Sequence, residues 1–409
     1  MRDPDIIHIA VYPAHGKTHS AAEDLSALAG YLKSLLSGFS PQSRCGHIVL
    51  TNKKSSGGER FTDSGLLVVE CWKKGSLSFA WSLFREILRH PKVRIVHLQH
   101  EFNQFGGAAA LPLTLVLLFA IRFLDCRKLV ITVHEVIYPD QITRKFLDSV
   151  FIPYPVALVR AVLRFYFSVL GFLANRLIAQ DEFFADRLRC DYRVRAPVDV
   201  VRIGTEIAKP VNRDEARRAL DLKLAGPVVL FFGTIDWRKG LDLLLDAWGE
   251  LPKGFGTLLI CGGEPVRVKN TREYRTWRVS LDEKMHAFGD VQCLGFVEDQ
   301  MLPTLFGATD LVVLPYIVPQ RVSAVFNQTT SYGVPLLASD VFKEQAEPTM
   351  IFGETATDLA AAISFAFSDN CFQLREASLS YRERNTWEKS AQTLSEIYSN
   401  LIETSHSPL

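Results

Sequence analysis

Short apolar runs alternate with longer amphipathic segments along almost the whole chain. Most runs are continuous in Val, Ile and Leu without strict alternation, which is typical of strands buried on both faces of a parallel sheet. The segments between them, such as 21–36 and 241–251, carry the 3.6-residue period of helices. The predicted strands are 6–13, 47–51, 66–72, 94–100, 128–136 and 175–180 in the first half, and 227–235, 256–263, 291–296, 311–316 and 335–341 in the second.

Strand and helix alternate in both halves, which predicts an α/β protein made of two Rossmann-like domains. The length of 409 residues suits two domains. Gly204, Pro210 and nearby charged residues indicate a linker before a new helix. We therefore expect one domain at 1–205 and a second at 206–386. The last segment, 387–409, contains a helix predicted over 387–403 that crosses back to the first domain.

The composition, 48% hydrophobic and 22% charged, is that of a folded globular protein and excludes disorder, collagen and coiled coil. Seven cysteines are scattered singly without a CxxC pair, which favours a reducing, cytoplasmic environment. The opening MRDPDIIHIAVYP carries acids and only a four-residue apolar run, so we expect no signal peptide.

The net charge of +1 conceals a difference between the two halves. Residues 1–205 hold 26 Lys and Arg against 18 Asp and Glu, whereas residues 206–409 hold 20 against 27. A basic first half indicates contact with an anionic surface or ligand. Its basic residues are spread out rather than gathered in a stripe, so no nucleic-acid partner is expected.

Two segments approach the length and apolarity of a membrane span. Residues 102–121 are uncharged, but Gly106, Gly107 and Pro112 interrupt them, which indicates a buried helix. Residues 156–177 combine aromatic residues with Arg160 and Arg164 on one helical face. This pattern suits either an interfacial helix at a membrane or a helix that covers a sheet. No transmembrane helix is predicted.

Several common sites are absent from the sequence. It holds no GxGxxG, no phosphate-binding loop of the GxxxxGK type and no GxSxG. These absences argue against the common classes of dehydrogenase, ATPase and serine hydrolase. His97 and His100 are three residues apart on a predicted strand, so their side chains should point to opposite faces and cannot share a metal.

Four segments of the second half follow one another at recognisable spacings. They are GTIDWRKGLDLLLDAW (233–248), LLICGG (258–263), LGFVEDQMLPTLFGATDLVVLPY (294–316) and SYGVPLLASDV (331–341). As a set they resemble the donor domain of retaining glycosyltransferases of family 4, which have the GT-B fold. The resemblance implies two Rossmann-like domains facing across a cleft, with a nucleotide-sugar donor bound by the second.

The first half resembles the acceptor domain of that family more loosely. The segments that carry this likeness are 12–16, HEFNQFGG (100–107), ITVHEV (131–136) and NRLIAQDEFFADRL (175–188). His134 matches the family's histidine that contacts the donor sugar. His100 and Glu101 are candidates to hold the acceptor. Gly16 remains from the family's N-terminal glycine pair and is a candidate for close approach to a phosphate.

Two cations lie where a sugar nucleotide would need them. Arg238 and Lys239 stand between a predicted strand and a helix beginning near Leu241, where the helix dipole favours anions. Lys239 matches the family's pyrophosphate-binding lysine. The family places an arginine directly after the glycine of this motif, where this chain has Thr234. We expect Arg238 to supply that guanidinium; the alternative is a solvated charge pair on a turn.

The loop after residue 316 departs from the family. The two positions that carry glutamates in most members are Gln320 and Gln328 here. Glutamine still hydrogen-bonds hydroxyl groups, although it loses the added strength of a charged acceptor. Ser323, Ala324 and Val325 resemble a variant turn of some relatives and should open a helix whose amides face the diphosphate or the sugar.

The resemblance therefore implies a retaining glycosyltransferase on the cytoplasmic face of a membrane, with a nucleotide sugar as substrate and a glycan or glycolipid as acceptor. A peripheral contact with anionic lipid is an additional expectation. No DxD pair stands at a strand end, so no metal and no other cofactor is expected. Two alternatives stay open: a non-catalytic partner protein that keeps the fold, and a GT-B sugar-nucleotide epimerase.

Overall fold

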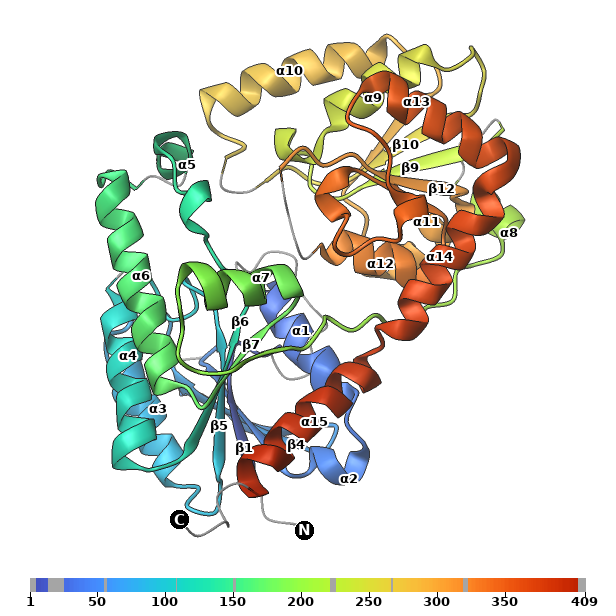
Figure 1. Cartoon of the computed structure of the whole chain (residues 1–409). Helices are drawn as coiled ribbons and strands as arrows, with labels where there is room; N and C mark the ends of the chain where they lie inside the picture. The colour runs from blue at the N-terminus through green and yellow to red at the C-terminus, as the bar shows by residue number, and fades with distance from the viewer. Residues whose placement is uncertain are drawn as a thin grey trace. The chain divides into compact units, whose positions relative to one another are not determined.

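The chain folds into two compact units in a computed structural model (Figure 1). The structure describes residues 5–13, 26–54, 57–107, 109–149, 152–220, 226–265, 268–318 and 323–403. Unit 1 comprises Met1–Gly204 together with Trp387–Leu409, and unit 2 comprises Thr205–Thr386. The last helix therefore belongs to the first unit, and the predicted crossing back of the C-terminal helix is confirmed.

Unit 1 is built on an eight-stranded sheet in the order β3-β4-β2-β1-β5-β6-β7-β8. All neighbours are parallel except β3, which pairs antiparallel with β4. In the centre, Ile9 of β1 lies opposite Leu50 of β2 and Leu98 of β5. The strands are β1 (Ile6–Ile9), β2 (His47–Asn52), β3 (Arg60–Asp63), β4 (Leu66–Trp72), β5 (Ile95–His100), β6 (Lys128–Val133), β7 (Arg176–Ala179) and β8 (Val198–Val200).

Helices cover both faces of this sheet, because successive strand residues point to opposite sides. Alternate residues of β1 and β5 contribute to two separate hydrophobic clusters. One cluster lies under α3, α4 and α6, and the other lies under α1 and α15. The helices of unit 1 are α1 (Ser26–Ser37), α2 (Pro41–Arg44), α3 (Phe79–Leu88), α4 (Ala110–Phe119), which continues into the π-helical turn η1 (Ala120–Leu124), α5 (Arg144–Ser149), α6 (Val156–Leu173), α7 (Glu182–Asp186) and α15 (Trp387–Glu403).

Unit 2 has a five-stranded parallel sheet in the order β11-β10-β9-β12-β13. Its strands are β9 (Val228–Phe232), β10 (Thr257–Cys261), β11 (Val291–Gly295), β12 (Leu311–Leu314) and β13 (Leu336–Ala338). A single hydrophobic cluster joins them to the surrounding helices. Those helices are α8 (Arg213–Ala219), α9 (Leu241–Glu250), α10 (Arg272–His286), α11 (Leu302–Ala308), α12 (Ala324–Tyr332), α13 (Ala356–Phe365) and α14 (Cys371–Arg384).

Each predicted strand exists, usually one to four residues shorter than its apolar run. The sequence pattern missed β3 and β8. β3 is a four-residue antiparallel edge strand with alternating exposed and half-buried residues, and β8 has only three residues. Neither segment contains a continuous apolar run, so periodicity could not reveal it.

Helix α6 accounts for the ambiguous segment 156–177. It is the one helix of the described residues that is long and apolar enough to cross a membrane by length and composition. Its inner side, including Tyr166, Phe167 and Leu170, is buried against the sheet, and only a third of the helix is buried in all. α6 is therefore a helix that covers a sheet on one side and is open on the other.

Candidate functional site

The centre of unit 2 is a point where the order of the sheet reverses. From β9 the chain adds β10 and β11 on one side, and then β12 and β13 on the other. Open α/β sheets bind ligands outside the carboxyl ends of strands at such a point. The loops that follow β9 and β12 are therefore where a ligand of this unit is expected.

The turn after β9 is packed tightly against the loop after β12. Gly240 has a φ of 69°, and a Cβ at this position would lie 1.8 Å from the carbonyl oxygen of Pro315. The backbone N–H of Ile317 donates to the carbonyl of Arg238 over 3.1 Å. These contacts hold the short helix η4 (Trp237–Lys239), which carries both predicted cations, beside the end of β12.

Arg238 is fixed by a carboxylate that the sequence reading did not single out. Its guanidinium Nε lies 3.0 Å from Oδ1 of Asp236, and a second nitrogen lies 2.6 Å from Oδ2. Burial opposes ionisation of Asp236, but hydrogen bonds from Arg238 outweigh it and hold the pKa of the carboxyl below its usual range. The Arg238 side chain nevertheless stays 46% exposed, so its outer N–H groups are accessible.

Lys239 lies on an aromatic ring. Its ammonium nitrogen is 3.8 Å from the ring centroid of Tyr316, a residue 1% exposed at the end of β12. Burial and the adjacent Arg238 charge lower the pKa of Lys239 to about 8. The lysine is therefore largely protonated at neutral pH, and a bound anion would favour its charged form further.

Helix α12 begins next to this turn, as predicted. Ser323 is its N-cap and accepts a hydrogen bond from the N–H of Phe326 over 3.3 Å. A Cβ on Gly233, at the end of β9, would lie 3.2 Å from a methyl group of Val325. The first amides of the helix lack partners within the helix. The helix N-terminus, with Ala324 exposed, thus stands beside the β9 loop.

Gln328 lies on the same side of α12 as Ala324 and Val325, one turn further along. Its side chain is half-buried, and within the described residues it makes no side-chain hydrogen bond. The opposite side of α12 is occupied, because Asn327 bonds Gln345 and Tyr381. Thr234 is exposed on the β9 loop. The predicted donor residues Gly16 and Gln320 lie outside the described residues.

In unit 1, His134 follows β6 and is held by two glutamines. Its Nε2 lies 2.8 Å from Oε1 of Gln99, and its Nδ1 lies 2.8 Å from Nε2 of Gln180. Because the Gln180 amide donates to Nδ1, the ring proton is on Nε2 and is donated to Gln99. Burial, followed by the neighbouring His100, lowers the pKa of His134 to about 3. His134 is a neutral imidazole, and the ring of Tyr31 lies edge-on against it at 4.7 Å.

The two acceptor candidates differ in their surroundings. His100 is 2% exposed, and its Nε2 lies 2.7 Å from the Tyr166 hydroxyl of α6. Glu101, the next residue, is partly exposed. His97 points to the opposite face, where its Nδ1 lies 2.5 Å from the Tyr398 hydroxyl of α15. The prediction that His97 and His100 face opposite sides is therefore confirmed.

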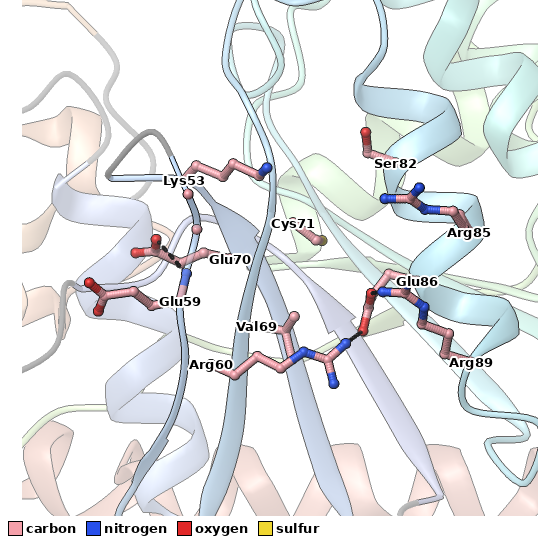
Figure 2. A pocket seen from close by; sticks show the side chains of 12 residues that line it. Lys53, Glu59, Arg60, Val69, Glu70, Cys71, Ser82, Arg85, Glu86 and Arg89 are labelled. Carbon is pink, nitrogen blue, oxygen red and sulfur yellow. Dashed lines mark hydrogen bonds and ion pairs between the residues drawn. The ribbon is translucent and has the colours of Figure 1, made fainter.

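A pocket of about 270 Å³ opens elsewhere in unit 1, between β3, β4 and α3 (Figure 2). Its buried carboxylate is neutralised: Glu86 is ion-paired with Arg60 and, over 2.6 Å, with Arg89. Burial raises the pKa of the Cys71 thiol to about 12, so the thiol is unreactive at neutral pH. No predicted site residue lines this pocket, which we interpret as structural.

Sequence reasoning missed four residues that organise the two candidate sites: Asp236, Tyr316, Gln99 and Gln180. Asp236 had a local signal, since it stands two positions before Arg238 in a turn. The other three are set by contacts between different strands, which no local pattern records. Across the described residues, no group of three or more His, Cys, Asp or Glu could hold a metal ion.

Comparison with known proteins gives the class of this architecture. The fold is that of GT-B glycosyltransferases. Sucrose-phosphate synthase from Thermosynechococcus elongatus superposes with a TM-score of 0.70 at 19% identity, over 98% of this chain and 100% of that one. Anabaena HepE in complex with UDP and glucose superposes with a TM-score of 0.67 at 16% identity, over 97% and 99%.

Part of the second unit is similar to a known family. Residues 226–369 match the family model described as glycosyl transferases group 1, and this range contains most of the donor-site candidates. A D-inositol 3-phosphate glycosyltransferase from Mycobacterium marinum is 26% identical over 245 residues, which are 56% of this chain and 51% of that protein. The chain thus matches about half the length of such curated relatives.

Proposed function

We propose that this protein is a retaining glycosyltransferase that moves a sugar from a nucleoside-diphosphate donor to a hydroxyl group of a glycolipid, oligosaccharide or polysaccharide. The observation that carries the proposal is the pair Arg238 and Lys239, held at the carboxyl edge of β9 beside the N-terminus of α12. The match of 226–369 to glycosyl transferases group 1 supports it. The Anabaena chain of the same fold was solved with UDP and glucose.

The proposed reaction needs no nucleophile from the protein. The bond between the anomeric carbon and the diphosphate oxygen breaks, and the acceptor hydroxyl oxygen bonds that carbon on the same face. The hydroxyl proton passes to the departing diphosphate. Catalysis then consists of positioning the two substrates and of stabilising negative charge on the leaving group. Lys239, Arg238 and the first amides of α12 perform the second task.

The remaining candidates hold the substrates. Gln328 is proposed to hydrogen-bond the ribose, and Thr234, Ser323, Ala324 and Val325 to border the diphosphate and the sugar. Neutral His134 is proposed to contact the donor sugar, with Glu101 and His100 on the acceptor side; the burial of His100 would give it an indirect, positioning part. Transfer is proposed to need no metal, so it should continue in excess EDTA.

The experiment uses the purified full chain and a panel of nucleotide sugars. A bound donor raises the melting temperature by mass action, which identifies the base and sugar. The donor that gives a shift is then incubated with glycolipid and glycan acceptors, and the anomeric configuration of the product is read by NMR. Retention of configuration is expected. An inverted product would refute the retaining mechanism, and donor binding without transfer or hydrolysis would favour a non-catalytic partner protein.

A further inference from the structure

Three helices of unit 1 lie side by side on one face of its sheet. Helix α3 packs against α4, and α4 packs against α6 (Figure 1). The rings of Phe123, in the turn η1 that continues α4, and of Phe172 of α6 are 6.0 Å apart. The outer sides of the three helices therefore form one continuous surface, which we call the three-helix face.

This face concentrates the exposed apolar side chains of the protein. The structure describes twenty large hydrophobic residues that are exposed, and twelve of them lie on these helices or within two residues of them, while the other eight are scattered over unit 2 and the linker. Trp81 is 65% exposed and Phe165 is 66% exposed. The twelve are Leu77, Trp81, Leu88, Val116, Phe119, Phe123, Leu124, Tyr154, Leu158, Val162, Phe165 and Phe172.

The charges on the same helices are almost all positive. Arg85, Arg122, Arg160 and Arg164 belong to them. Within the described part of the chain, Glu86 is the one acidic residue on these helices, and Asp125, which directly follows η1, is ion-paired with Arg127 over 2.5 Å. Glu86 is 3% exposed and is ion-paired with Arg60 and Arg89, so it presents no free negative charge. The three-helix face thus offers aromatic and aliphatic side chains interspersed with arginines.

We propose that the three-helix face docks on an anionic lipid bilayer. An apolar surface of this extent is costly to leave in water, and soluble proteins rarely expose one without a partner. Aromatic residues with interspersed arginines match the boundary between lipid headgroups and acyl chains, where rings insert and guanidinium groups meet phosphates. The packing of α6 on the sheet makes this a peripheral contact, with only the outer sides of the helices in the lipid.

Charge argues against a second copy of the chain as the occupant. A two-fold dimer places the same patch on both partners, so arginines would face arginines with no unpaired acid on either side. A bilayer with anionic headgroups supplies the missing counter-charge. The surface is formed by unit 1 alone, and its membrane contact does not depend on the transferase activity proposed for the donor site.

The test is sedimentation of the full chain with vesicles of phosphatidylcholine alone or mixed with phosphatidylglycerol. We expect strong binding to the mixed vesicles, weakened severalfold by salt at 0.5 M. Phe119→Ser with Phe165→Ser should reduce binding by about tenfold or more, because two exposed rings no longer insert. Arg85→Gln with Arg164→Gln should reduce the preference for anionic vesicles by a similar factor.

Matched controls come from unit 2. Val279→Ser with Phe372→Ser removes side chains that are 59% and 72% exposed, and Arg272→Gln removes an exposed arginine; both should bind vesicles like the wild type. Lys239→Ala should also bind normally, which separates this surface from the donor site. Wild-type binding by the Phe119 and Phe165 double variant would overturn the proposal. So would a dimer that this variant dissociates while vesicle binding is unchanged.

Discussion

Lys239 places its ammonium charge in a partly buried environment, which lowers the pKa of the group. Its ammonium lies over Tyr316 and beside Arg238, and burial lowers its pKa to about 8. A cation that is partly desolvated before a ligand arrives interacts more strongly with that ligand than a fully hydrated one. Arg238 is instead held by an ion pair with Asp236. Substitution of Arg238 and substitution of Lys239 should therefore lower the activity by different factors.

We expect Lys239→Ala to lower kcat by about 100-fold or more, because the charge on the leaving diphosphate loses a partly buried contact. Steady-state rates with the donor found by thermal shift would measure this. Lys253→Ala, which removes an exposed lysine before β10, is the control and should behave as wild type. Turnover of Lys239→Ala within threefold of wild type would remove the residue from the site.

The pKa of Lys239 also predicts how binding depends on pH. Protonated lysine binds the diphosphate, and the bound anion raises the pKa above the free value of about 8. Affinity should therefore be nearly constant from pH 7 to 8 and fall by up to about tenfold per unit above pH 8. Calorimetric titration with nucleoside diphosphate at pH 7, 8 and 9 measures this. Lys239→Arg should remove the fall, and an equal fall in that variant would assign it to another group.

Gln328 tests whether the donor site is intact despite its missing acids. Gln328→Ala should weaken binding of the nucleoside diphosphate by about 0.5–2 kcal/mol, the usual value of a hydrogen bond and its unsatisfied partner. Gln328→Glu should keep or tighten binding through a charged acceptor. Calorimetry of both variants decides the matter, with exposed Gln300→Ala as the control. Unchanged affinity in both variants would show that Gln328 does not touch the nucleotide.

At the scale of elements, the candidate site depends on how closely the β9–α9 turn approaches the end of β12. Gly240 combines a left-handed φ of 69° with a neighbouring carbonyl that leaves no room for a Cβ. At the other end of the same turn, a Cβ on Gly233 would lie 3.2 Å from a methyl group of Val325 in α12. These glycines allow the loop after β9 to pack against the loop after β12 and against α12. This packing places the Lys239 ammonium over the Tyr316 ring.

We expect Gly240→Ala to destabilise unit 2 by more than about 2 kcal/mol, since it adds a clash of backbone atoms to the cost of a positive φ. Gly254→Ala is the matched control: its φ is 73°, but no atom lies within 4 Å of the added Cβ. It should cost about 1 kcal/mol, the conformational part alone. Urea unfolding gives the free energy of unfolding of both variants. Equal decreases in the two variants would show that the turn shifts to relieve the clash.

At the scale of the whole molecule, the two units differ in the chemistry of their interiors. Unit 1 contains six histidines whose pKa values burial lowers: His8, His47, His90, His97, His100 and His134. Several of them are linked through Gln99 and Tyr398, and so join the sheet to the C-terminal helix. The sequence of unit 2 has one histidine, His286, and its side chain is exposed.

This difference predicts that acid destabilises unit 1 first. The folded pKa values lie below the ordinary 6.5, so each neutral histidine contributes stability above pH 6.5 that is lost as pH falls below it. The loss is up to about 1.4 kcal/mol per histidine for each unit of pH. Hydrogen exchange read by mass spectrometry at pH 7 and 5.5, corrected for intrinsic rates, should show lost protection in unit 1. Earlier loss in unit 2 would contradict it.

The sequence by itself determined most of the strands and their order along the chain, apart from β3 and β8. Continuous runs such as 228–232 and 311–314 are typical of strands buried on both faces. The first residues of the helices 241–250, 324–332 and 387–403 were also predicted correctly. The motif series of the second half also placed Arg238 and Lys239 in a loop between strand and helix. These signals are local, because adjacent residues share one backbone and one pattern of burial.

Only the tertiary structure decided which side chains meet. Lys239 and Tyr316 are far apart in sequence and touch because β9 and β12 are neighbours in the sheet. His134 is held between Gln99 and Gln180 because β5, which contains Gln99, and β7, which precedes Gln180, lie on either side of β6. The apolar outer side of α6 is part of a larger apolar surface only because α4 packs beside it and α3 packs beside α4. Such contacts follow from strand order and packing, which bring distant residues together and which no single segment encodes.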